Sequence, residues 1–438
     1  MGKQLKPYDK YMETGILWVP RVPAHWKITR NKNVMKLKKE LVGSDHGKYT
    51  LLSLTLKGII PRDMKNPKGK FPKDFSTYQA VDINDLVFCL FDIDETPRTV
   101  GLAPLSGMIT GAYTIFSVFD NTNAKFLYYF YLSMDNSKSL KPLYTGLRKV
   151  ITSDTFLRTK LPLPPLEEQL QIVKYLDKQL TKIDRFIKGK QKLISLLKEQ
   201  IELCLYGNRN VIESWDNAFP PDWLLIKANR IFKEIKISNC PDKELLAVTQ
   251  DKGVIFKKDS EKNFVSPSGD LSGLKLVREG DFVISLRSFQ GGIEHSEIEG
   301  IVSPAYNVFS LREDYRNEEY NLYYKYLFKT KAFISILNTL VSGIRDGKNI
   351  NYSDFSKIKV PVPPKETIKE LLSFIKQYEI IKEQFEKEFK ILSEYRIRLI
   401  SDVVTGNVDV RHIEIDEVSE DEDIFELEEV LEGEECEV

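Results

Sequence analysis

The chain has 438 residues, of which 42% are apolar and 29% are charged, and its formal net charge is zero. This composition is typical of a soluble globular protein, and the length suggests about three domains. No stretch approaches the roughly 18 uncharged apolar residues of a membrane span, and the start, Met1 to Lys10, is polar, so we expect neither a membrane helix nor a secretory signal.

The charge is unevenly distributed. The segment Ile413–Val438 holds 14 acidic residues and no Lys or Arg, so the remaining chain carries about +14. A basic body suggests a nucleic-acid partner, because phosphate groups attract clustered Lys and Arg side chains. The acidic tail, residues 412–438, is expected to be disordered, since its like charges repel one another.

Cysteine and histidine form no metal pattern. The four cysteines are far apart without a C-x-x-C pair, and the four histidines are widely separated. Such cysteines are typical of thiols in a reducing compartment, so we expect a cytoplasmic protein without disulfides or bound metal. The chain also lacks a G-x-x-x-x-G-K-[ST] phosphate loop, and we expect no cofactor in it.

The first 160 residues alternate short apolar runs with turn signals. Runs at Tyr49–Leu56, Asp85–Phe91 and Tyr113–Phe119 are rich in β-branched and aromatic residues, and they predict strands. The run Lys125–Met134 favours a short helix. We therefore interpret residues 1–160 as a mixed α/β globule.

A long amphipathic helix follows, within residues 161–207. It begins after Pro165, which suits the first helical position, and Gly207 can terminate it. Its apolar residues recur at spacings of three and four, which is the heptad seam of a coiled coil. The predicted seam residues are Val173, Leu176, Leu180, Ile183, Ile187, Ile194, Leu197 and Ile201, with one polar interruption at Lys190.

The same order of features then returns. Trp26 is matched by Trp223, Gly58 by Gly253, and other pairs keep offsets between 193 and 200. The chain is therefore a tandem duplication, with a second globule at residues 208–359 and a second helix within residues 360–411. The second seam keeps a constant offset of 198 and comprises Leu371, Phe374, Tyr378, Ile381, Phe385, Leu392, Tyr395 and Leu399, interrupted by Glu388.

Two helices with matching seams most simply bury them against each other. Each would be about 40 residues and roughly 60 Å long. The spacing permits a parallel or an antiparallel pair, and we favour the antiparallel one, because each helix follows its own globule. The expected fold class is α+β: two mixed α/β domains separated by a long two-helix antiparallel coiled coil, in a pseudo-twofold tandem repeat.

The sequence resembles the specificity subunits of type I restriction–modification systems. The segments that carry the resemblance are Leu161–Gln169 with Lys182–Asp184 and Lys192–Lys198, then Gly107–Tyr113, Gly300–Tyr306 and Leu399–Arg411. The second copy has Lys365-Glu366-Thr367 after Pro364 and lacks the glutamine that the first copy has at Gln169.

The resemblance implies a non-enzymatic reader of double-stranded DNA. Each globule would be a target-recognition domain that reads one half of a split, asymmetric sequence. The helices would set the gap and dock two modification subunits, which would bring restriction subunits. S-adenosylmethionine, ATP and magnesium would then belong to those partners.

Loop residues are the candidates for DNA contact, because base edges and phosphates are read by Arg, Lys, Asn, Gln and Ser. The basic loop Lys57–Lys73 could lie along a phosphate backbone. The plainer explanation for this loop is a flexible solubilising segment, and for the turns at residues 148–149 and 345–349 it is solvated turn charge. The candidates are Arg62, Lys65, Lys68, Lys70, Arg148, Lys149, Arg287, Ser288, Gln290, Arg345, Lys348 and Asn349.

Two other function classes remain open at this stage. A scaffold could use the same helices to join two protein-binding domains without touching DNA. A nuclease is weakly suggested by Pro221-Asp222 followed by Glu234-Ile-Lys236, a pattern that is frequent in charge-rich chains. No Asn- or Asp-Pro-Pro-aromatic motif of an amino-methyltransferase is present.

Overall fold

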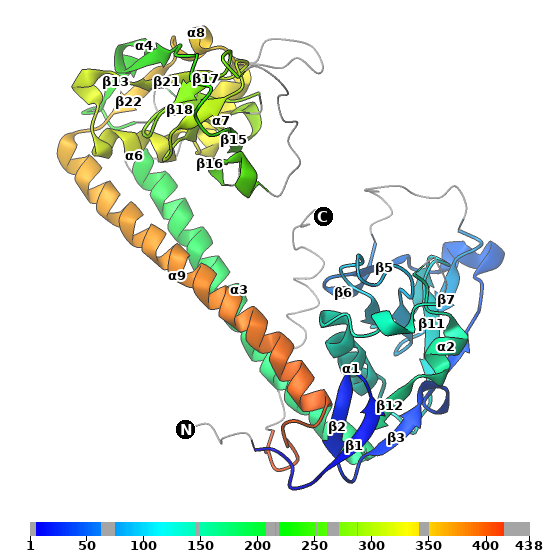
Figure 1. Cartoon of the computed structure of the whole chain (residues 1–438). Helices are drawn as coiled ribbons and strands as arrows, with labels where there is room; N and C mark the ends of the chain where they lie inside the picture. Colours follow the sequence, from blue (N-terminus) through cyan, green and yellow to red (C-terminus); the bar gives the residue numbers. More distant parts are fainter. Residues whose placement is uncertain are drawn as a thin grey trace. The chain divides into compact units, whose positions relative to one another are not determined.

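The computed structural model describes residues 6–62, 75–145, 149–206, 215, 219–250, 252–260, 271–286, 288–340 and 350–415. These form two compact units (Figure 1). Unit 1 comprises Met1–Lys188 with Glu388–Val438, and unit 2 comprises Gly189–Lys387. Each unit thus holds one globule and half of both long helices. The predicted acidic tail lies outside the described residues from position 416 onward.

The centre of unit 1 is a four-stranded antiparallel sheet in the order β4-β11-β8-β9. The strands are β4 (Met35–Lys38), β11 (Thr114–Val118), β8 (Leu86–Phe88) and β9 (Val100–Leu102). The helix α1 (Ala124–Asn136) packs on it, because its buried face presents Tyr131 to Phe88, with ring centroids 5.1 Å apart. The sequence therefore predicted this helix and two of these strands, although the strands are shorter than expected.

Smaller two-stranded ribbons complete unit 1, and all of them are antiparallel. Their members, together with one short helix, are β1 (Tyr11–Ile16), β2 (Val19–Pro23), β3 (Lys27–Arg30), β12 (Lys160–Leu163), β5 (Leu52–Thr55), β6 (Gly58–Pro61), β7 (Gln79–Val81), β10 (Gly107–Ile109) and α2 (Ser153–Arg158).

Unit 2 repeats this architecture. Its main sheet has the matching order β14-β21-β18-β19, with β14 (Phe232–Ile235), β21 (Asn307–Leu311), β18 (Phe282–Ile284) and β19 (Glu294–His295). The remaining elements are β13 (Leu224–Lys227), β22 (Lys359–Val362), β15 (Leu246–Thr249), β16 (Gly253–Phe256), β17 (Lys275–Val277), β20 (Gly300–Val302), α4 (Ala228–Ile231), α5 (Ser288–Gly291), α6 (Glu318–Leu327), α7 (Lys331–Thr339) and α8 (Tyr352–Phe355). The predicted α+β tandem repeat is confirmed.

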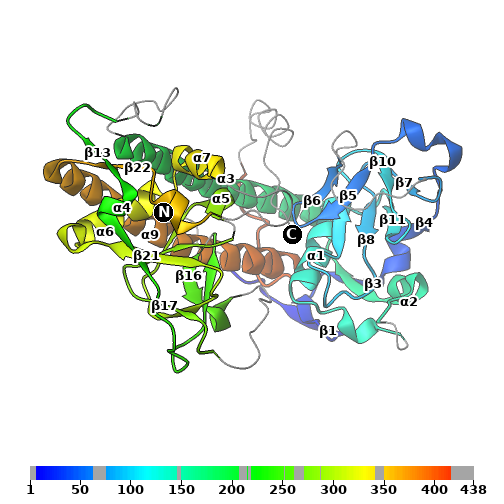
Figure 2. The ribbon, with the colours of Figure 1, turned by 90° about the horizontal axis from the view of Figure 1, so that it is seen from above.

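The long helices are α3 (Leu166–Leu205) and α9 (Lys365–Val404), each of 40 residues. They lie side by side in both views (Figure 1, Figure 2). In unit 1 the start of α3 shares a core with the end of α9, through Leu176 and Val403. In unit 2 the end of α3 shares a core with the start of α9. The pair is therefore antiparallel, as expected, and Arg396 Nη1 of α9 lies 2.6 Å from Asp184 Oδ1 of α3 in unit 1.

Burial follows the predicted seam closely. The seam residues of both helices are buried or half-buried, apart from Tyr395, which is 45% exposed. The expectation that Tyr395 is buried in the seam is wrong, because an amphipathic tyrosine can pack its ring while its hydroxyl stays in water. Among the described residues, no helix is both long and apolar enough to cross a membrane.

A buried carboxylate joins the start of α3 to the N-terminal segment of unit 1. Glu168 is 6% exposed and accepts hydrogen bonds from the hydroxyl of Tyr8 at 2.6 Å and from Nε1 of Trp26 at 3.0 Å. The hydroxyl of Tyr11 donates to the carbonyl of Gly406, just after α9. Gly406 has a φ of 73°, and a Cβ there would clash with Pro23. The N-terminal segment thus contacts both the first turn of α3 and the residue Gly406 after α9.

Candidate nucleic-acid interface

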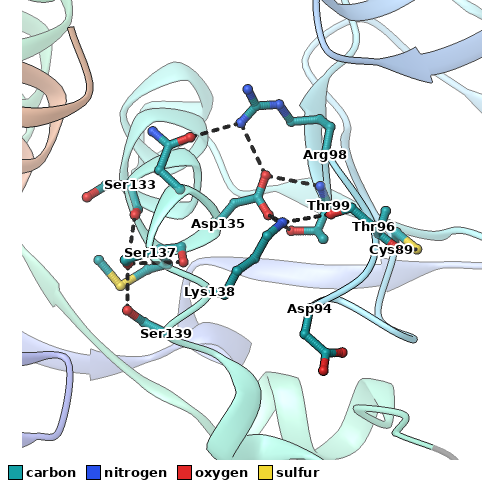
Figure 3. A network of polar contacts seen from close by, with 12 residues as sticks. Cys89, Asp94, Thr96, Arg98, Thr99, Ser133, Asp135, Ser137, Lys138 and Ser139 are labelled. Carbon is teal, nitrogen blue, oxygen red and sulfur yellow. Dashed lines mark hydrogen bonds and ion pairs between the residues drawn. The ribbon is translucent and has the colours of Figure 1, made fainter. Parts of the chain in front are cut away.

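The loop between β8 and β9 in unit 1 is held by one buried carboxylate, Asp135 of α1 (Figure 3). Asp135 is 3% exposed and accepts hydrogen bonds from the backbone N–H and the hydroxyl of Thr99, at 3.1 and 2.6 Å. Arg98 Nη1 lies 3.1 Å from it and Lys138 Nζ lies 2.7 Å from it. Because a buried charge is tolerated only when it is paired and hydrogen-bonded, this network defines the conformation of the loop.

Lys149 is brought against the same loop. Its Nζ lies 2.7 Å from Glu95 Oε1 and 3.3 Å from Asp94 Oδ2. Hydrogen bonds to these carboxylates raise the pKa of Lys149. The hydroxyl of Tyr144 also donates to Asp94 and lowers the pKa of that carboxyl. The charge of Lys149 is thus balanced within the protein, which weakens the argument that it binds phosphate.

The corresponding loop in unit 2, between β18 and β19, contains the short helix α5. Ser288 is 1% exposed, and its hydroxyl accepts a hydrogen bond from the N–H of Ser285 at 2.8 Å. The prediction that Ser288 contacts a base is therefore wrong, because its side chain stabilises its own turn. Gln290 is exposed on the same helix and stays a candidate.

This loop is also fastened by a buried ion pair. Lys329 pairs with Glu294, which is 4% exposed on its side chain, and donates to the carbonyl of Gly291 at 2.9 Å. Gly292 has a φ of 82°, and any Cβ there would meet the carbonyl of Phe328. Both units therefore fix the loop between the last two strands of the main sheet with a buried carboxylate and a Lys, although the partners differ. A fixed loop can present side chains to a ligand without a large ordering cost.

A second pair of equivalent loops caps the hairpins β5–β6 and β15–β16. The hydroxyl of Thr55 donates to the carbonyl of Gly58 at 2.9 Å, and that of Thr249 donates to Gly253 at 3.0 Å. Arg62 follows the first hairpin, where its backbone N–H donates to the carbonyl of Leu51 at 2.8 Å and its side chain is half-buried.

The other candidates for DNA contact lie outside the described residues, and they stay predictions. They are Lys65, Lys68, Lys70, Arg148, Arg287, Arg345, Lys348 and Asn349.

The structure shows one set of basic residues that the sequence analysis did not single out. Arg30 lies directly opposite Lys160 in unit 1, and Lys227 lies directly opposite Lys359 in unit 2. Their offsets of 197 and 199 fall within the range of the repeat. Comparing the two copies of the repeat for positions that are basic in both would have identified these four residues from the sequence.

Metal or nuclease chemistry finds no support in the described part of the chain. No group of three or more His, Cys, Asp and Glu residues there could hold a metal ion. Glu234 of the nuclease-like pattern forms an ion pair with Lys236, at 2.9 Å. The loops described above are instead held in fixed conformations on the surface of each unit.

Comparison with known proteins gives a consistent result. Residues 109–196 and 229–392 match the family model described as "Type I restriction modification DNA specificity domain". The chain is 23% identical over 268 residues to the curated protein "Putative type I restriction enzyme MjaX specificity subunit" of Methanocaldococcus jannaschii. That alignment covers 58% of this chain and 60% of the relative, so the chain spans about three fifths of its length.

A solved structure described as "Structural basis underlying complex assembly and conformational transition of the type I R-M system" is also similar to this chain. It aligns with a TM-score of 0.58 at 14% identity, covering 87% of this chain and 98% of that chain. At this level of identity the likeness shows a shared fold.

Proposed function

This chain belongs to the type I restriction–modification DNA specificity family, and from that membership we propose that it reads a split DNA sequence on behalf of a modification complex. The match to the family model spans more than half of the chain.

The observation that carries the proposal is the duplicated plan. Each unit has the same sheet order, the same pair of fastened loops, and one end of the antiparallel helix pair in its core. A protein that reads two half-sites needs two similar DNA-reading domains, here called heads, on one scaffold. The basic charge of the chain outside the acidic tail supplies the general attraction to phosphate.

Differences between the heads support an asymmetric target. The β8–β9 loop is anchored by Asp135 with Arg98 and Lys138, whereas the β18–β19 loop is anchored by Glu294 with Lys329. The second loop also contains a helical turn, α5. Because sequence is read by particular side chains on base edges, two different loops favour two different half-sites.

The helix pair is proposed to be the spacer between the half-sites. A helix of 40 residues rises about 60 Å, which corresponds to roughly 17 or 18 base pairs. Half-site readers must face grooves at least one helical turn apart, about 34–36 Å. The helix pair is therefore long enough to be the spacer between two half-sites.

The chain itself is proposed to be non-catalytic. Two modification subunits would dock on the helix pair, and restriction subunits would join through them. Their S-adenosylmethionine, ATP and magnesium would supply the chemistry of methyl transfer and cleavage. Exposed apolar side chains on α3 offer a surface for such docking, since scattered single apolar residues are common but a stripe along one helix is less so. They include Leu193, Leu196 and Leu203.

The decisive experiment maps DNA methylation in cells with and without this protein and its modification partner. We expect one split sequence to be methylated only when both are present. Uniform methylation, or none, would reject the proposal. A gel-shift titration across salt addresses the scaffold alternative, because a DNA reader loses affinity steeply as salt rises whereas a scaffold has no DNA affinity at any salt.

A further inference from the structure

A basic face runs along the half of α3 that belongs to unit 1. Its cations follow one another at spacings of four, four, three and three residues, which places them on one side of the helix. The buried seam, with Leu176 and Ile183, lies on the opposite side of the same turns. All the cations are exposed except Lys178, which is half-buried. The basic face comprises Lys174, Lys178, Lys182, Arg185 and Lys188.

The acidic residues of this part of α3 are engaged with other elements. Asp177 Oδ2 lies 2.8 Å from Lys125 Nζ of α1. Asp184 Oδ1 lies 2.6 Å from Arg396 Nη1 of α9. The sequence supplies no other Asp or Glu between residues 169 and 188. The positive charge of the basic face is therefore not balanced by α3 itself.

The second copy of the repeat lacks this face. Arg185 corresponds at the repeat offset of 198 to Glu383 of α9. Lys188 corresponds in the same way to Glu386. A ligand that bound both halves of the pseudo-twofold repeat alike would meet opposite charges at these equivalent positions, and binding partners are matched in charge. The basic face therefore suits an anionic partner that is present only once.

The acidic tail leaves unit 1 beside this face. The side-chain amide of Gln171 on α3 donates to the carbonyl of Val410 at 3.0 Å and to that of Ile413 at 2.7 Å. Ile413 and Ile415 also pack against the core of unit 1. Gln171 precedes Lys174 by three residues, so it lies on the same side of the helix, less than one turn away. The chain after Ile415 thus starts next to the basic face.

That part of the acidic tail matches the basic face in charge and in reach. Residues 416–438 hold 13 Asp and Glu side chains and no Lys or Arg. A segment of this length can extend up to about 76 Å, whereas α3 rises about 21 Å between Lys174 and Lys188. Exposed ion pairs are individually weak, but a tether that begins at the face keeps the effective concentration of the carboxylates high.

We propose that residues 416–438 of the acidic tail dock on the basic face of α3 and shield it from other polyanions. This goes beyond the proposed function and does not require that the chain reads a DNA sequence. The contact is electrostatic, so it weakens as salt screens the charges. The shield would limit non-specific attraction between this helix and nucleic acid.

The first test is zero-length cross-linking of the purified full chain with a carbodiimide, which joins a lysine amine to a carboxylate in direct contact. Peptide mass spectrometry then identifies the linked residues. At about 50 mM potassium chloride we expect links from Lys174, Lys182 and Lys188 to residues 416–438. About tenfold fewer are expected at about 1 M, where screening acts within about 3 Å. Lys32 and Lys160, exposed on other elements of unit 1, are internal controls.

A mixture of isotope-labelled and unlabelled chain is cross-linked in parallel. Links within one copy join peptides of the same label, whereas links between copies also join peptides of different label. We expect the links between the basic face and residues 416–438 to carry one label only. This arm separates docking within the chain from association of two copies.

The second test measures affinity for labelled heparin, a polyanion without base sequence, at low salt. In a full-length variant, each Asp and Glu after Ile415 is replaced by its amide. We expect this variant to bind heparin about tenfold more tightly than the wild type, because the basic face is uncovered. Thermal unfolding of every variant checks that the fold is retained.

Neutralising the basic face should remove that gain. The amide variant is combined with Lys174→Gln, Lys182→Gln and Lys188→Gln, and its affinity is compared with that of the triple variant alone. The matched control removes the same charge from exposed lysines of α9, by Lys376→Gln, Lys382→Gln and Lys387→Gln. The control should keep the gain, since α9 lacks the basic face.

Equal cross-linking of Lys32 or Lys160 to residues 416–438 would contradict the docking, because the contact would not be specific to the face. Links of mixed label would overturn it in favour of a second copy as the occupant. An amide variant without any gain in heparin affinity would also reject it, as would a gain that persists without the α3 lysines. None of these outcomes bears on whether the two units read DNA, which methylation mapping tests.

Discussion

Asp85 and Asp281 occupy equivalent positions in the two units, but one neighbouring residue gives the two carboxylates different surroundings. Each carboxylate accepts a backbone N–H in an equivalent turn, from Asp82 and from Arg278, both at 2.8 Å. In unit 1 Lys38 Nζ lies 3.0 Å from Asp85, but unit 2 has Ile235 at the position matching Lys38. Without that cation, burial raises the pKa of Asp281 to about 6.

Asp281→Asn is predicted to stabilise unit 2 at neutral pH. The folded pKa of about 6 lies above the ordinary aspartate pKa of 3.8, so burying the charge costs stability fully above pH 6, and the cost disappears as pH falls toward 3.8. Two pKa units correspond to about 3 kcal/mol as an order of magnitude. The amide oxygen can still accept the N–H of Arg278.

The measurement is denaturant unfolding of wild type and Asp281→Asn between pH 4 and pH 8, values chosen to lie on either side of about 6. The variant should be more stable at the upper end, and the difference should vanish at the lower end. A difference that is independent of pH would show that the carboxylate does not titrate in this window.

At the scale of elements, a tyrosine fastens each globule to its long helix. The hydroxyl of Tyr129 on α1 donates to Asp177 of α3 at 2.5 Å, and the hydroxyl of Tyr326 on α6 donates to Glu379 of α9 at 2.6 Å. Burial and the nearby carboxylate raise the pKa of both tyrosines, so both remain protonated donors. The two attachments use equivalent helices in the two units.

Tyr129→Phe is predicted to lower the free energy of unfolding by about 1–2 kcal/mol, because a hydrogen bond to a charged group is lost from a buried site. Tyr128→Phe is the matched control. Its ring centroid lies 5.5 Å from that of Tyr129 with the two rings tilted, and within the described chain its hydroxyl has no hydrogen-bond partner. Equal losses in the two variants would mean that the hydroxyl of Tyr129 contributes nothing specific.

At the scale of the whole molecule, the length of α3 and α9 should set the unread gap. Inserting three heptads into both helices, at Lys188/Gly189 and Lys387/Glu388, adds about 31 Å, or roughly nine base pairs. That is close to one turn of DNA, so both heads would still meet the same face of the duplex. Methylation mapping should find the same half-sites separated by a gap about nine base pairs longer.

Two contrasting variants sharpen this experiment. One heptad in both helices shifts the heads by about three base pairs, roughly a third of a DNA turn, and should weaken methylation. Three heptads in α3 alone leave its seam unpaired and should destabilise the protein. Methylation with an unchanged gap in the matched three-heptad variant would show that the helices do not measure the distance.

Local patterns allowed much of the fold to be predicted. The spacing of residues such as Leu176 and Leu371 indicates a buried helical seam, because helical periodicity depends only on near neighbours. The run around Tyr129 predicted α1 for the same reason. Strand lengths were overestimated, as at Asp85–Phe91, because where a strand ends depends on the extent of its partner.

Side-chain roles in loops were harder to predict. Ser288 is a polar residue in a loop, but its hydroxyl turns inward to Ser285. Lys149 is a basic residue in a turn, but Asp94 and Glu95 come from a distant segment to balance it. Composition cannot distinguish a residue that faces a ligand from one that completes its own turn.

By itself, the sequence determined that the chain is a duplicated globule and helix, because repeat offsets and heptad spacing are properties of order along the chain. Only the tertiary structure decided that α3 and α9 are antiparallel, since a seam has the same spacing in either direction. It also decided that Arg30 faces Lys160, because strand register joins residues about 130 positions apart through backbone hydrogen bonds that no local pattern encodes.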